Sequence, residues 1–358
     1  MKLGKSGKAP VITVIGCGMM GSAITWPAAE NGCRIRLVGS PLDGDIIAHA
    51  KKTGEHLTLK RPFPEGGKNY EYYTVDEFDR AVPGTDLFIC GVSSFGLDWF
   101  IGEMIPRLPD GIPVLSITKG MLHTGGGAMI SYPEKMEETA AKLGKKIDFC
   151  AVGGPCTSYE LADRDPSCVT FCGRKPELLK AIRALFESDY YFVSLSTDVR
   201  GVECAVALKN AYALGISLAI GMSYRREGRE FEHYNSQAAL FGQAVKEMRR
   251  LLAFCEGGED NITLGAGDLY VTVFGGRTRK LGILLGEGKS FEEAKKILAG
   301  VTLESTVIAA RTAEAVCALE EAGRADPSDF PMLHHIGRLL AGETGIDVPW
   351  TAFESESF

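Results

Sequence analysis

The chain has 358 residues, which is more than one ordinary domain needs and suits two. Hydrophobic residues make up 45% of it and charged residues 24%, enough for sizeable cores and for solubility. The formal net charge of −7 argues against broad binding to nucleic acid or to an anionic membrane, but it leaves room for a local basic pocket that holds a small anion.

The sequence carries no sign of export or of membrane insertion. The apolar run 11–15 is too short for the core of a signal peptide. We find no apolar run long enough to span a bilayer. The ten cysteines form no CxxC pair, so we expect reduced thiols and no metal site. We therefore predict a cytoplasmic protein with no nucleic-acid partner.

Short apolar strands alternate with helical stretches in the first half of the chain. The predicted strands are 11–15, 34–38, 87–90, 113–117, 149–152, 168–172 and 191–195. Because these runs are apolar on both faces and separated by helices, they indicate an α/β fold with a mostly parallel, doubly wound sheet.

The strands stop at about Thr197, and helical patterns follow. The predicted helices are 198–222, 235–255, 290–298, 303–321 and 331–341. The charged segment 223–234 has no apolar period and is predicted to be a surface loop. We therefore place one domain at 1–197 and a helical domain at 198–358.

A glycine-rich motif, Gly16-Cys17-Gly18-Met19-Met20-Gly21, follows the first buried strand and opens a helix. This is the context in which GxGxxG binds the pyrophosphate of a dinucleotide. Gly16 permits the tight turn, Gly18 lets the backbone approach the phosphates, and Gly21 lets the helix pack on the strand. A glycine-rich structural turn is the alternative.

The second strand leaves the choice between NAD and NADP open. An acidic residue at its end would bind the ribose 2′-hydroxyl of NAD. Ser40 is neutral there, Asp43 lies beyond a proline, and no arginine stands nearby for a 2′-phosphate. We lean slightly to NAD.

Four further segments carry polar residues in apolar surroundings. They are Ser116–Gly120, which ends in Thr-Lys-Gly; Gly153–Ala162, which contains Gly-Pro; Gly201–Asn210, which ends in Ala-Leu-Lys-Asn; and Gly267–Gly282, which begins Gly-Asp-Leu. Taken singly, each has a plain structural reading, because a lone helical lysine usually reaches solvent and a cationic run usually forms a solvated surface.

In order and at this spacing, these motifs resemble the NAD(P)-dependent glycerol-3-phosphate dehydrogenases. The likeness runs nearly end to end and includes Leu285–Gly288 and Phe330–Leu333. It implies a Rossmann-type NAD(P)-binding domain, an all-helical substrate domain, and a homodimer. It also implies interconversion of sn-glycerol 3-phosphate and dihydroxyacetone phosphate by hydride transfer.

The resemblance also implies roles for individual residues. Lys209 is the candidate general acid and base, Asp268 orients it, and Lys119 completes the catalytic set. Substrate contacts are expected from Lys119, Asn210, Thr272, Arg277 and Thr278, with the Arg277 fork suited to phosphate. Cofactor contacts are expected from Gly16, Gly18, Met19, Met20, Gly21, Ser40, Lys119, Arg277 and Glu304.

The chain departs from the family pattern near the expected substrate. Thr278 stands where the family normally has Asn, which leaves Arg279 as an alternative contact. Cys156-Thr157 replaces Ser or Asn followed by Phe, Val92-Ser93-Ser94 lacks the usual proline, and the loop 223–234 is long. Two other functions therefore stay open: a dehydrogenase of a longer polyol phosphate, and a non-catalytic NAD(P)-binding sensor.

Overall fold

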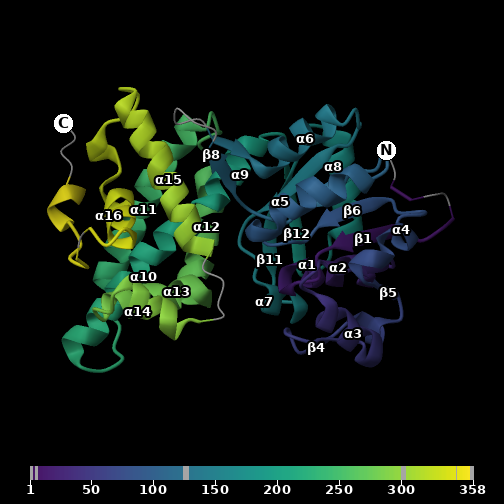
Figure 1. Cartoon of the computed structure of the whole chain (residues 1–358), viewed down its shortest axis with the longest axis horizontal. Coiled ribbons are helices and arrows are strands. Elements are labelled where there is room, and N and C mark those ends of the chain that lie inside the picture. The colour runs from purple at the N-terminus through teal and green to yellow at the C-terminus, as the bar shows by residue number, and fades with distance from the viewer. Residues whose placement is uncertain (1–2, 5–6, 124–128, 300–303, 344, 355–358) are drawn as a thin grey trace. The chain divides into compact units, whose positions relative to one another are not determined.

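The computed structural model in Figure 1 describes residues 3–4, 7–123, 129–299, 304–343 and 345–354, with the backbone alone at 123, 304 and 305. The chain divides into two compact units. Met1–Lys119 and Tyr132–Val199 form the first, and Gly120–Ser131 and Arg200–Phe358 form the second. The sequence predicts one continuous domain over 1–197, whereas the structure assigns the excursion at 120–131 to the helical unit.

The first unit is built on one mixed sheet. In the described part of the chain it has eight strands in the order β12-β11-β10-β7-β6-β1-β2-β5. The strands are β1 (Val11–Ile15), β2 (Arg34–Val38), β5 (Tyr70–Tyr73), β6 (Leu87–Cys90), β7 (Val114–Ser116), β10 (Phe149–Gly153), β11 (Ser167–Cys172) and β12 (Tyr191–Ser196). Neighbours run parallel except β10 and β11. The predicted parallel-dominated sheet is confirmed.

Strand β5 lies at an edge of the sheet and was not predicted. Its sequence, Tyr-Glu-Tyr-Tyr, lacks the continuous apolar character of the central strands. Small hairpins were missed as well, because their strands have only two or three residues. They are β3 (Glu55–His56) with β4 (Arg61–Pro62), and β8 (Met121–His123) with β9 (Met129–Ser131).

Helices connect and flank the strands of this unit (Figure 1). They are α1 (Met19–Ala23), α2 (Thr25–Glu30), α3 (Gly44–Thr53), α4 (Phe78–Ala81), α5 (Leu97–Trp99), α6 (Tyr132–Lys142), α7 (Ser158–Ala162) and α8 (Pro176–Phe186). In α8, Pro176 begins the helix with a favourable φ, and Leu178, Ile182 and Phe186 bury one face at helical spacing. Such apolar faces fix the helices on the sheet.

In its described residues, the second unit is helical apart from the β8–β9 hairpin and the connecting turns. Its helices are α9 (Val199–Ala207), α10 (Lys209–Glu227), α11 (Tyr234–Phe254), α12 (Asn261–Phe274), α13 (Gly276–Gly286), α14 (Phe291–Ile297), α15 (Glu304–Glu321) and α16 (Pro331–Leu340). The predicted helix at 198–222 is therefore two helices, which meet at Leu208. The predicted loop at 223–234 is shorter than expected, because α10 continues to Glu227.

The run Val199–Glu227 is long and apolar enough to cross a membrane, contrary to our expectation that no such run exists. However, 89% of its most apolar window is buried inside the structure. Residues 211–221 of helix α10 are all buried, so this part of the helix is covered on every side, which is the pattern of a core helix.

Helices α10 and α13 approach each other closely through glycines. A Cβ on Gly282 would lie 2.4 Å from Ser217 Cβ, one on Gly286 would lie 2.2 Å from Leu218 O, and one on Gly221 would lie 2.1 Å from Ile283 O. Any side chain at these positions would force the helices apart. This contact holds α13, which carries two predicted site residues, against α10, which carries two more.

Candidate active site

The glycine motif forms the turn from β1 into α1. Gly16 has φ +99°, a conformation that L-residues with side chains rarely adopt. A Cβ on Gly21 would lie 2.3 Å from Gly16 O and 2.9 Å from Gly91 O, so this glycine allows the helix to pack on the strand ends. Gly91, which follows β6, shares this close approach, although sequence reasoning did not identify it.

Gly18 differs from Gly16 and Gly21 because it has open space beside its Cα atom. A Cβ built on it meets no atom within 4 Å, and the residue precedes the first turn of α1. Met19 and Met20 are half-buried and pack against the core of the first unit. The open space above Gly18 is where the backbone can receive a phosphate, so the residues present fit a dinucleotide.

The peptide groups on either side of Cys17 are held by two buried side chains from outside the loop. The Cys17 N–H donates to Asp43 Oδ2 at 2.9 Å. Cys17 O lies 3.0 Å from His56 Nε2. Because His56 Nδ1 accepts from the Leu59 N–H, we assign the ring proton to Nε2, which donates to Cys17 O. The middle of the glycine loop is thus anchored from both sides.

Asp43, which holds the glycine loop, also binds the segment after β2, where the cofactor ribose was expected. Asp43 Oδ2 also accepts from the Ser40 N–H at 2.8 Å, and Ser40 Oγ accepts from the Leu42 N–H at 3.3 Å. Asp43 is buried, so its carboxylate serves the backbone of both the glycine loop and the end of β2. Sequence reasoning dismissed Asp43 because a proline precedes it, and the contact with Cys17 spans 26 positions.

Lys119 lies at the carboxyl ends of the parallel strands, where doubly wound sheets bind their ligands. It follows β7, and its Nζ donates to Gly154 O at 2.7 Å, just beyond β10. The preceding Thr118 hydroxyl donates to Val92 O at 2.7 Å, just beyond β6. Two side chains after one strand therefore tie together the loops that follow three neighbouring strands.

Lys209 and Asp268 form an ion pair inside the helical unit. Lys209 begins α10, Asp268 lies in α12, and Nζ is 2.6 Å from Oδ1. The side chain of Lys209 is 14% exposed and that of Asp268 is 1% exposed. Two well-packed apolar residues at these buried positions would often stabilise the fold as much as the ion pair does, so stability alone does not explain the pair. The pair therefore points to chemistry at the ammonium group.

Two polar residues accompany this pair. Asn210 follows Lys209 in α10 and is half-buried. Thr272 lies one turn beyond Asp268 in α12, and its hydroxyl donates to the Asp268 backbone carbonyl at 2.7 Å. The Thr272 oxygen keeps acceptor capacity while it donates. Asn210 thus adjoins Lys209 in the chain, and Thr272 follows Asp268 by one helical turn.

The cationic run in α13 divides into residues with different surroundings. Arg277 is exposed, and it makes no ion pair with any residue that the structure describes. Thr278 is buried. Arg279 pairs with Glu232 at 2.6 Å and donates to Val273 O, so it is engaged within the unit. Of these three residues, Arg277 has the guanidinium available for an anion.

Glu304 is the remaining residue that was predicted to contact the cofactor. Glu304 begins α15, but its side chain lies outside the described part of the structure. The predicted residues therefore fall into two groups. The glycine loop, Ser40 and Lys119 belong to the first unit, whereas Lys209, Asn210, Asp268, Thr272, Arg277 and Thr278 belong to the second.

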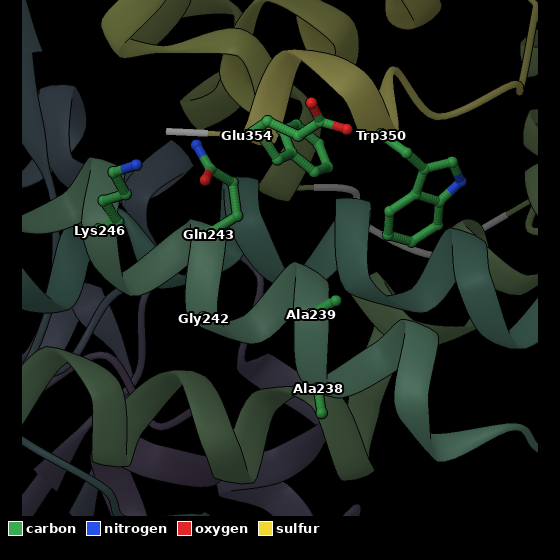
Figure 2. A pocket seen from close by; sticks show the side chains of 8 residues that line it. Ala238, Ala239, Gly242, Gln243, Lys246, Trp350 and Glu354 are labelled. Carbon is green, nitrogen blue, oxygen red and sulfur yellow. The ribbon is translucent and has the colours of Figure 1, made fainter. Parts of the chain in front are cut away.

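A separate hollow lies between α11 and the turn at Trp350–Phe353 (Figure 2). It has a volume of about 410 Å³ and lies in the helical unit. Its lining residues are Ala238, Ala239, Gly242, Gln243, Lys246, Trp350, Phe353 and Glu354. None of the predicted site residues lines it. Lys246 is therefore a half-buried lysine of the same unit that can serve as a control.

A doubly wound sheet with this glycine turn, together with a helical unit that buries a lysine–carboxylate pair, defines a dinucleotide-dependent dehydrogenase. Residues 11–178 match the family model described as the NAD-dependent glycerol-3-phosphate dehydrogenase N-terminus. Residues 198–348 match the model for the C-terminus of the same enzymes. The chain belongs to the NAD-dependent glycerol-3-phosphate dehydrogenase family, as its motifs predicted.

Individual relatives agree with this assignment. The NADP(+)-dependent glycerol-3-phosphate dehydrogenase of Archaeoglobus fulgidus is 28% identical over 352 residues, which cover 97% of this chain and 99% of the relative. The glycerol-3-phosphate dehydrogenase (NAD(P)+) of Desulfotalea psychrophila is 29% identical, over 80% of this chain and 82% of the relative. The fold is similar to that of the Coxiella burnetii glycerol-3-phosphate dehydrogenase, with a TM-score of 0.77, 23% identity, and coverage of 96% and 98%.

Proposed function

We propose that this chain interconverts sn-glycerol 3-phosphate and dihydroxyacetone phosphate, with NAD or NADP as hydride carrier and Lys209 as general acid and base. The observation that carries the proposal is the ion pair between Lys209 and Asp268, which holds an ammonium group in an apolar unit. The bound nicotinamide supplies or accepts the hydride.

The role of Lys209 follows from the charge that the reaction creates. When a ketone receives a hydride, negative charge develops on its oxygen, and that oxygen then needs a proton. An ammonium group stabilises the charge and delivers the proton, and in the reverse direction the neutral amine removes it. Asp268 fixes the direction of Nζ through the bond of 2.6 Å and balances its charge.

The substrate's other groups suit the remaining residues. Asn210 and Thr272 offer hydrogen bonds to hydroxyl and carbonyl oxygens. The exposed Arg277 guanidinium offers two parallel N–H donors to phosphate oxygens. Lys119 and Thr278 are proposed as further contacts. Gly16, Gly18 and Gly21, with Met19, Met20 and Ser40, are proposed to hold the dinucleotide, with Arg277 and Glu304 contributing to it.

The test is the oxidation of reduced nicotinamide. The purified protein is mixed with dihydroxyacetone phosphate and either NADH or NADPH, and the absorbance of the reduced cofactor is followed. We expect turnover with at least one cofactor. The relative rates of NADH and NADPH oxidation measure the cofactor preference, which the sequence leaves open with a slight lean to NAD. Cofactor binding without turnover on any polyol phosphate would refute the proposal in favour of a sensor.

A longer polyol phosphate is the second candidate substrate. Thr278 motivates it, because a threonine is shorter than the asparagine usual in the family and is buried here. A panel of three-, four- and five-carbon ketose phosphates decides between them. We expect the highest kcat/KM for the three-carbon substrate, and a higher value for a longer one would overturn that choice.

We also propose that the protein is a cytoplasmic homodimer. All ten cysteines are free thiols, eight of them buried or half-buried, which suits a reducing compartment. Sedimentation equilibrium should give twice the mass of 38.6 kDa. A monomer at micromolar concentration that retains turnover would contradict the dimer without affecting the proposed reaction.

A further inference from the structure

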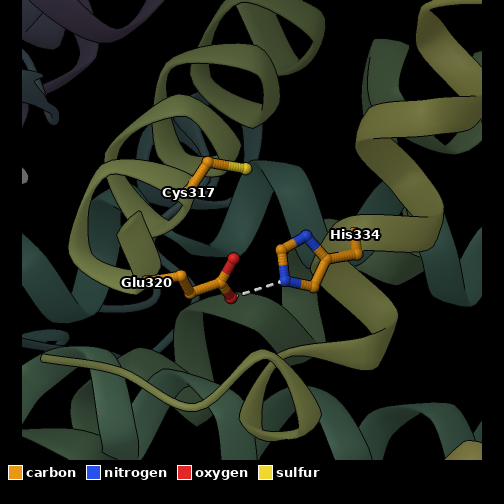
Figure 3. Close-up of side chains that lie close together, drawn as sticks. All are labelled: Cys317, Glu320 and His334. Atoms are coloured by element: carbon orange, nitrogen blue, oxygen red, sulfur yellow. Dashed lines mark hydrogen bonds and ion pairs between the residues drawn. The ribbon is translucent and has the colours of Figure 1, made fainter. Parts of the chain in front are cut away.

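Three side chains with metal-binding groups meet on the helical unit, apart from the candidate active site. Cys317 and Glu320 lie one turn apart on α15, and His334 lies on α16 (Figure 3). One ligand atom from each residue lies within 4.8 Å of the other two. Figure 3 shows the His334 ring facing both residues of α15, with one nitrogen toward Glu320 and the other on the Cys317 side.

One member of this group is already oriented by another. His334 Nε2 lies 2.7 Å from Glu320 Oε1. An ion bound by both groups would replace the hydrogen that now lies between Nε2 and this carboxylate. The Glu320 and His334 side chains are 13% and 26% exposed, whereas Cys317 is open to solvent. An ion can therefore reach the group from outside.

The two helices that supply the group are firmly held. Val316 and Leu319, next to Cys317 and Glu320, are fully buried, as is Leu333 next to His334. The buried Glu247 carboxylate accepts hydrogen bonds from the Met332 and Leu333 N–H groups in the first turn of α16. The three side chains therefore start from fixed backbone positions, so little order has to be imposed when an ion binds.

The geometry is close to what a tetrahedral metal ion requires. Zinc bonds of about 2.0–2.3 Å place ligand atoms roughly 3.3–3.8 Å apart. His334 Nε2 and Glu320 Oε1, now 2.7 Å apart, would separate by roughly half an ångström, and ligand atoms at the 4.8 Å limit would approach by roughly 1–1.5 Å; side-chain rotations can supply movements of this size.

The donor set selects the kind of ion. A thiolate, an imidazole and a carboxylate suit Zn²⁺, whereas Ca²⁺ and Mg²⁺ prefer oxygen ligands alone. The carboxylates of Glu320 and Glu321 place negative charge near the Cys317 thiol. The same negative potential attracts a cation.

We propose that Cys317, Glu320 and His334 form a binding site for Zn²⁺ or a similar transition-metal ion, with one position left to water. As the metal–sulfur bond forms, the thiol S–H bond breaks and its proton passes to solvent. The ion then links α15 to α16. The absence of CxxC pairs led us to expect no metal site, but a site assembled from two helices has no such spacing in the sequence.

Cobalt substitution tests the site by a signal that only a sulfur ligand produces. The reduced full-length protein is freed of metal with a chelator and titrated with Co²⁺. We expect a thiolate-to-cobalt charge-transfer band in the near ultraviolet that saturates at one ion per chain and disappears when Zn²⁺ is added. No band at any Co²⁺ concentration up to about 100 times that of the protein would overturn the proposal.

Two variants with a matched control assign the ligands. Cys317→Ser should abolish the band, and His334→Gln should weaken Co²⁺ binding at least about tenfold, since even outer partners of metal ligands are worth 10–100-fold. Cys168→Ser removes another exposed thiol and should leave the titration unchanged. A band that survives Cys317→Ser, or one that Cys168→Ser removes, would contradict the assignment.

Thermal unfolding gives a second readout that does not depend on catalysis. Because an ion that binds only the folded state stabilises it, Zn²⁺ should raise the Tm of the wild type and of Cys168→Ser, but not that of Cys317→Ser. An equal Tm shift in all three proteins would mean that zinc binds elsewhere. Both measurements can succeed or fail whatever the substrate of the enzyme is.

Discussion

The glycine loop and the lysine–carboxylate pair are built in opposite ways. The loop spans six consecutive residues, and it works because side chains are missing and backbone groups are exposed. The pair joins two side chains 59 positions apart in the sequence, and it works because an apolar unit surrounds them. A ligand held by backbone needs a local conformation, whereas a proton-transfer group needs an environment that the whole unit must supply.

The largest effect should come from removing the ammonium group. Lys209→Met should lower kcat by about 10²- to 10⁴-fold, the usual contribution of general acid–base catalysis, while the cofactor still binds. It should also lower the stability by about 3–5 kcal/mol, because the buried Asp268 carboxylate loses its partner. Steady-state kinetics and thermal unfolding separate the two effects.

Two further variants keep this prediction testable if Lys209→Met unfolds. Lys209→Met combined with Asp268→Asn removes both charges and should regain stability without regaining turnover. Lys246→Met changes a half-buried lysine of the same unit and should leave kcat near that of the wild type. Near-normal kcat in the double variant would show that another group supplies the proton.

The next effect distinguishes two glycines three positions apart. Gly21→Ala should destabilise the first unit by about 1–3 kcal/mol, because its Cβ would lie 2.3 Å from Gly16 O. Gly18→Ala should leave the Tm unchanged, because its Cβ meets nothing within 4 Å. It should nevertheless raise the Kd of the cofactor about tenfold or more, since the methyl group would occupy the place of the pyrophosphate.

The two glycine variants are compared by cofactor fluorescence titration and by thermal unfolding. Equal losses of stability in both variants would contradict the division of roles. If Gly18→Ala bound the cofactor as tightly as the wild type, the phosphates would have to lie elsewhere.

The sequence predicted what is local or continuous. Strands β1 and β6 are continuous apolar runs, and the spacing of the glycine motif by itself indicates a tight turn into a helix. Strand β5 was missed because an edge strand needs no continuous apolar run. Helices α12 and α13 were missed because glycines such as Gly265 and Gly282 lower helix propensity, although close packing against neighbouring helices requires them.

The site residues that the sequence did not indicate also depend on contacts between distant segments. Lys209 and Asp268 were found through their place in family motifs, whereas Asp43 and His56 belong to no motif. Their contacts with Cys17 span 26 and 39 positions, and they become visible only when the loop after β2 and the β3 strand lie beside the glycine turn. The residues that anchor the loop could therefore not be predicted from local pattern.

A smaller effect should follow from weakening that anchor at Asp43. Hydrogen bonds to a charged group contribute about 1.5–3 kcal/mol, and part of this is kept by the amide of Asn. Asp43→Asn should therefore raise the Kd of NAD and of NADP by roughly tenfold or less, and by the same factor for both. The exposed Asp45→Asn, in the first turn of the same helix, is the matched control.

Equality between the two cofactors is the informative part of this measurement. A carboxylate that only positions the loop affects both cofactors alike, because both share the pyrophosphate. If Asp43→Asn weakened NAD alone, the carboxylate would instead read the ribose 2′-hydroxyl, and the loop would not depend on it.

The smallest effect concerns the other side of the anchor and depends on pH. Burial lowers the pKa of His56 below its ordinary value of 6.5, against the raising effect of its bond to Cys17. As the pH falls below 6.5, protons therefore bind the unfolded chain before the folded one, and the stability falls until the folded-state pKa is passed. Above pH 6.5, His56 makes no contribution to the pH dependence of the stability.

His56→Gln isolates this contribution, because Gln keeps an N–H donor for Cys17 O and does not titrate. Urea unfolding is followed by tryptophan fluorescence at about pH 7.5 and about pH 5.5. The wild type should lose up to about 1 kcal/mol more than the variant on acidification, since each pH unit below 6.5 contributes at most about 1.4 kcal/mol. An equal loss in both proteins would mean that His56 titrates at its ordinary pKa. The neutral ring would then have no special part in holding the loop.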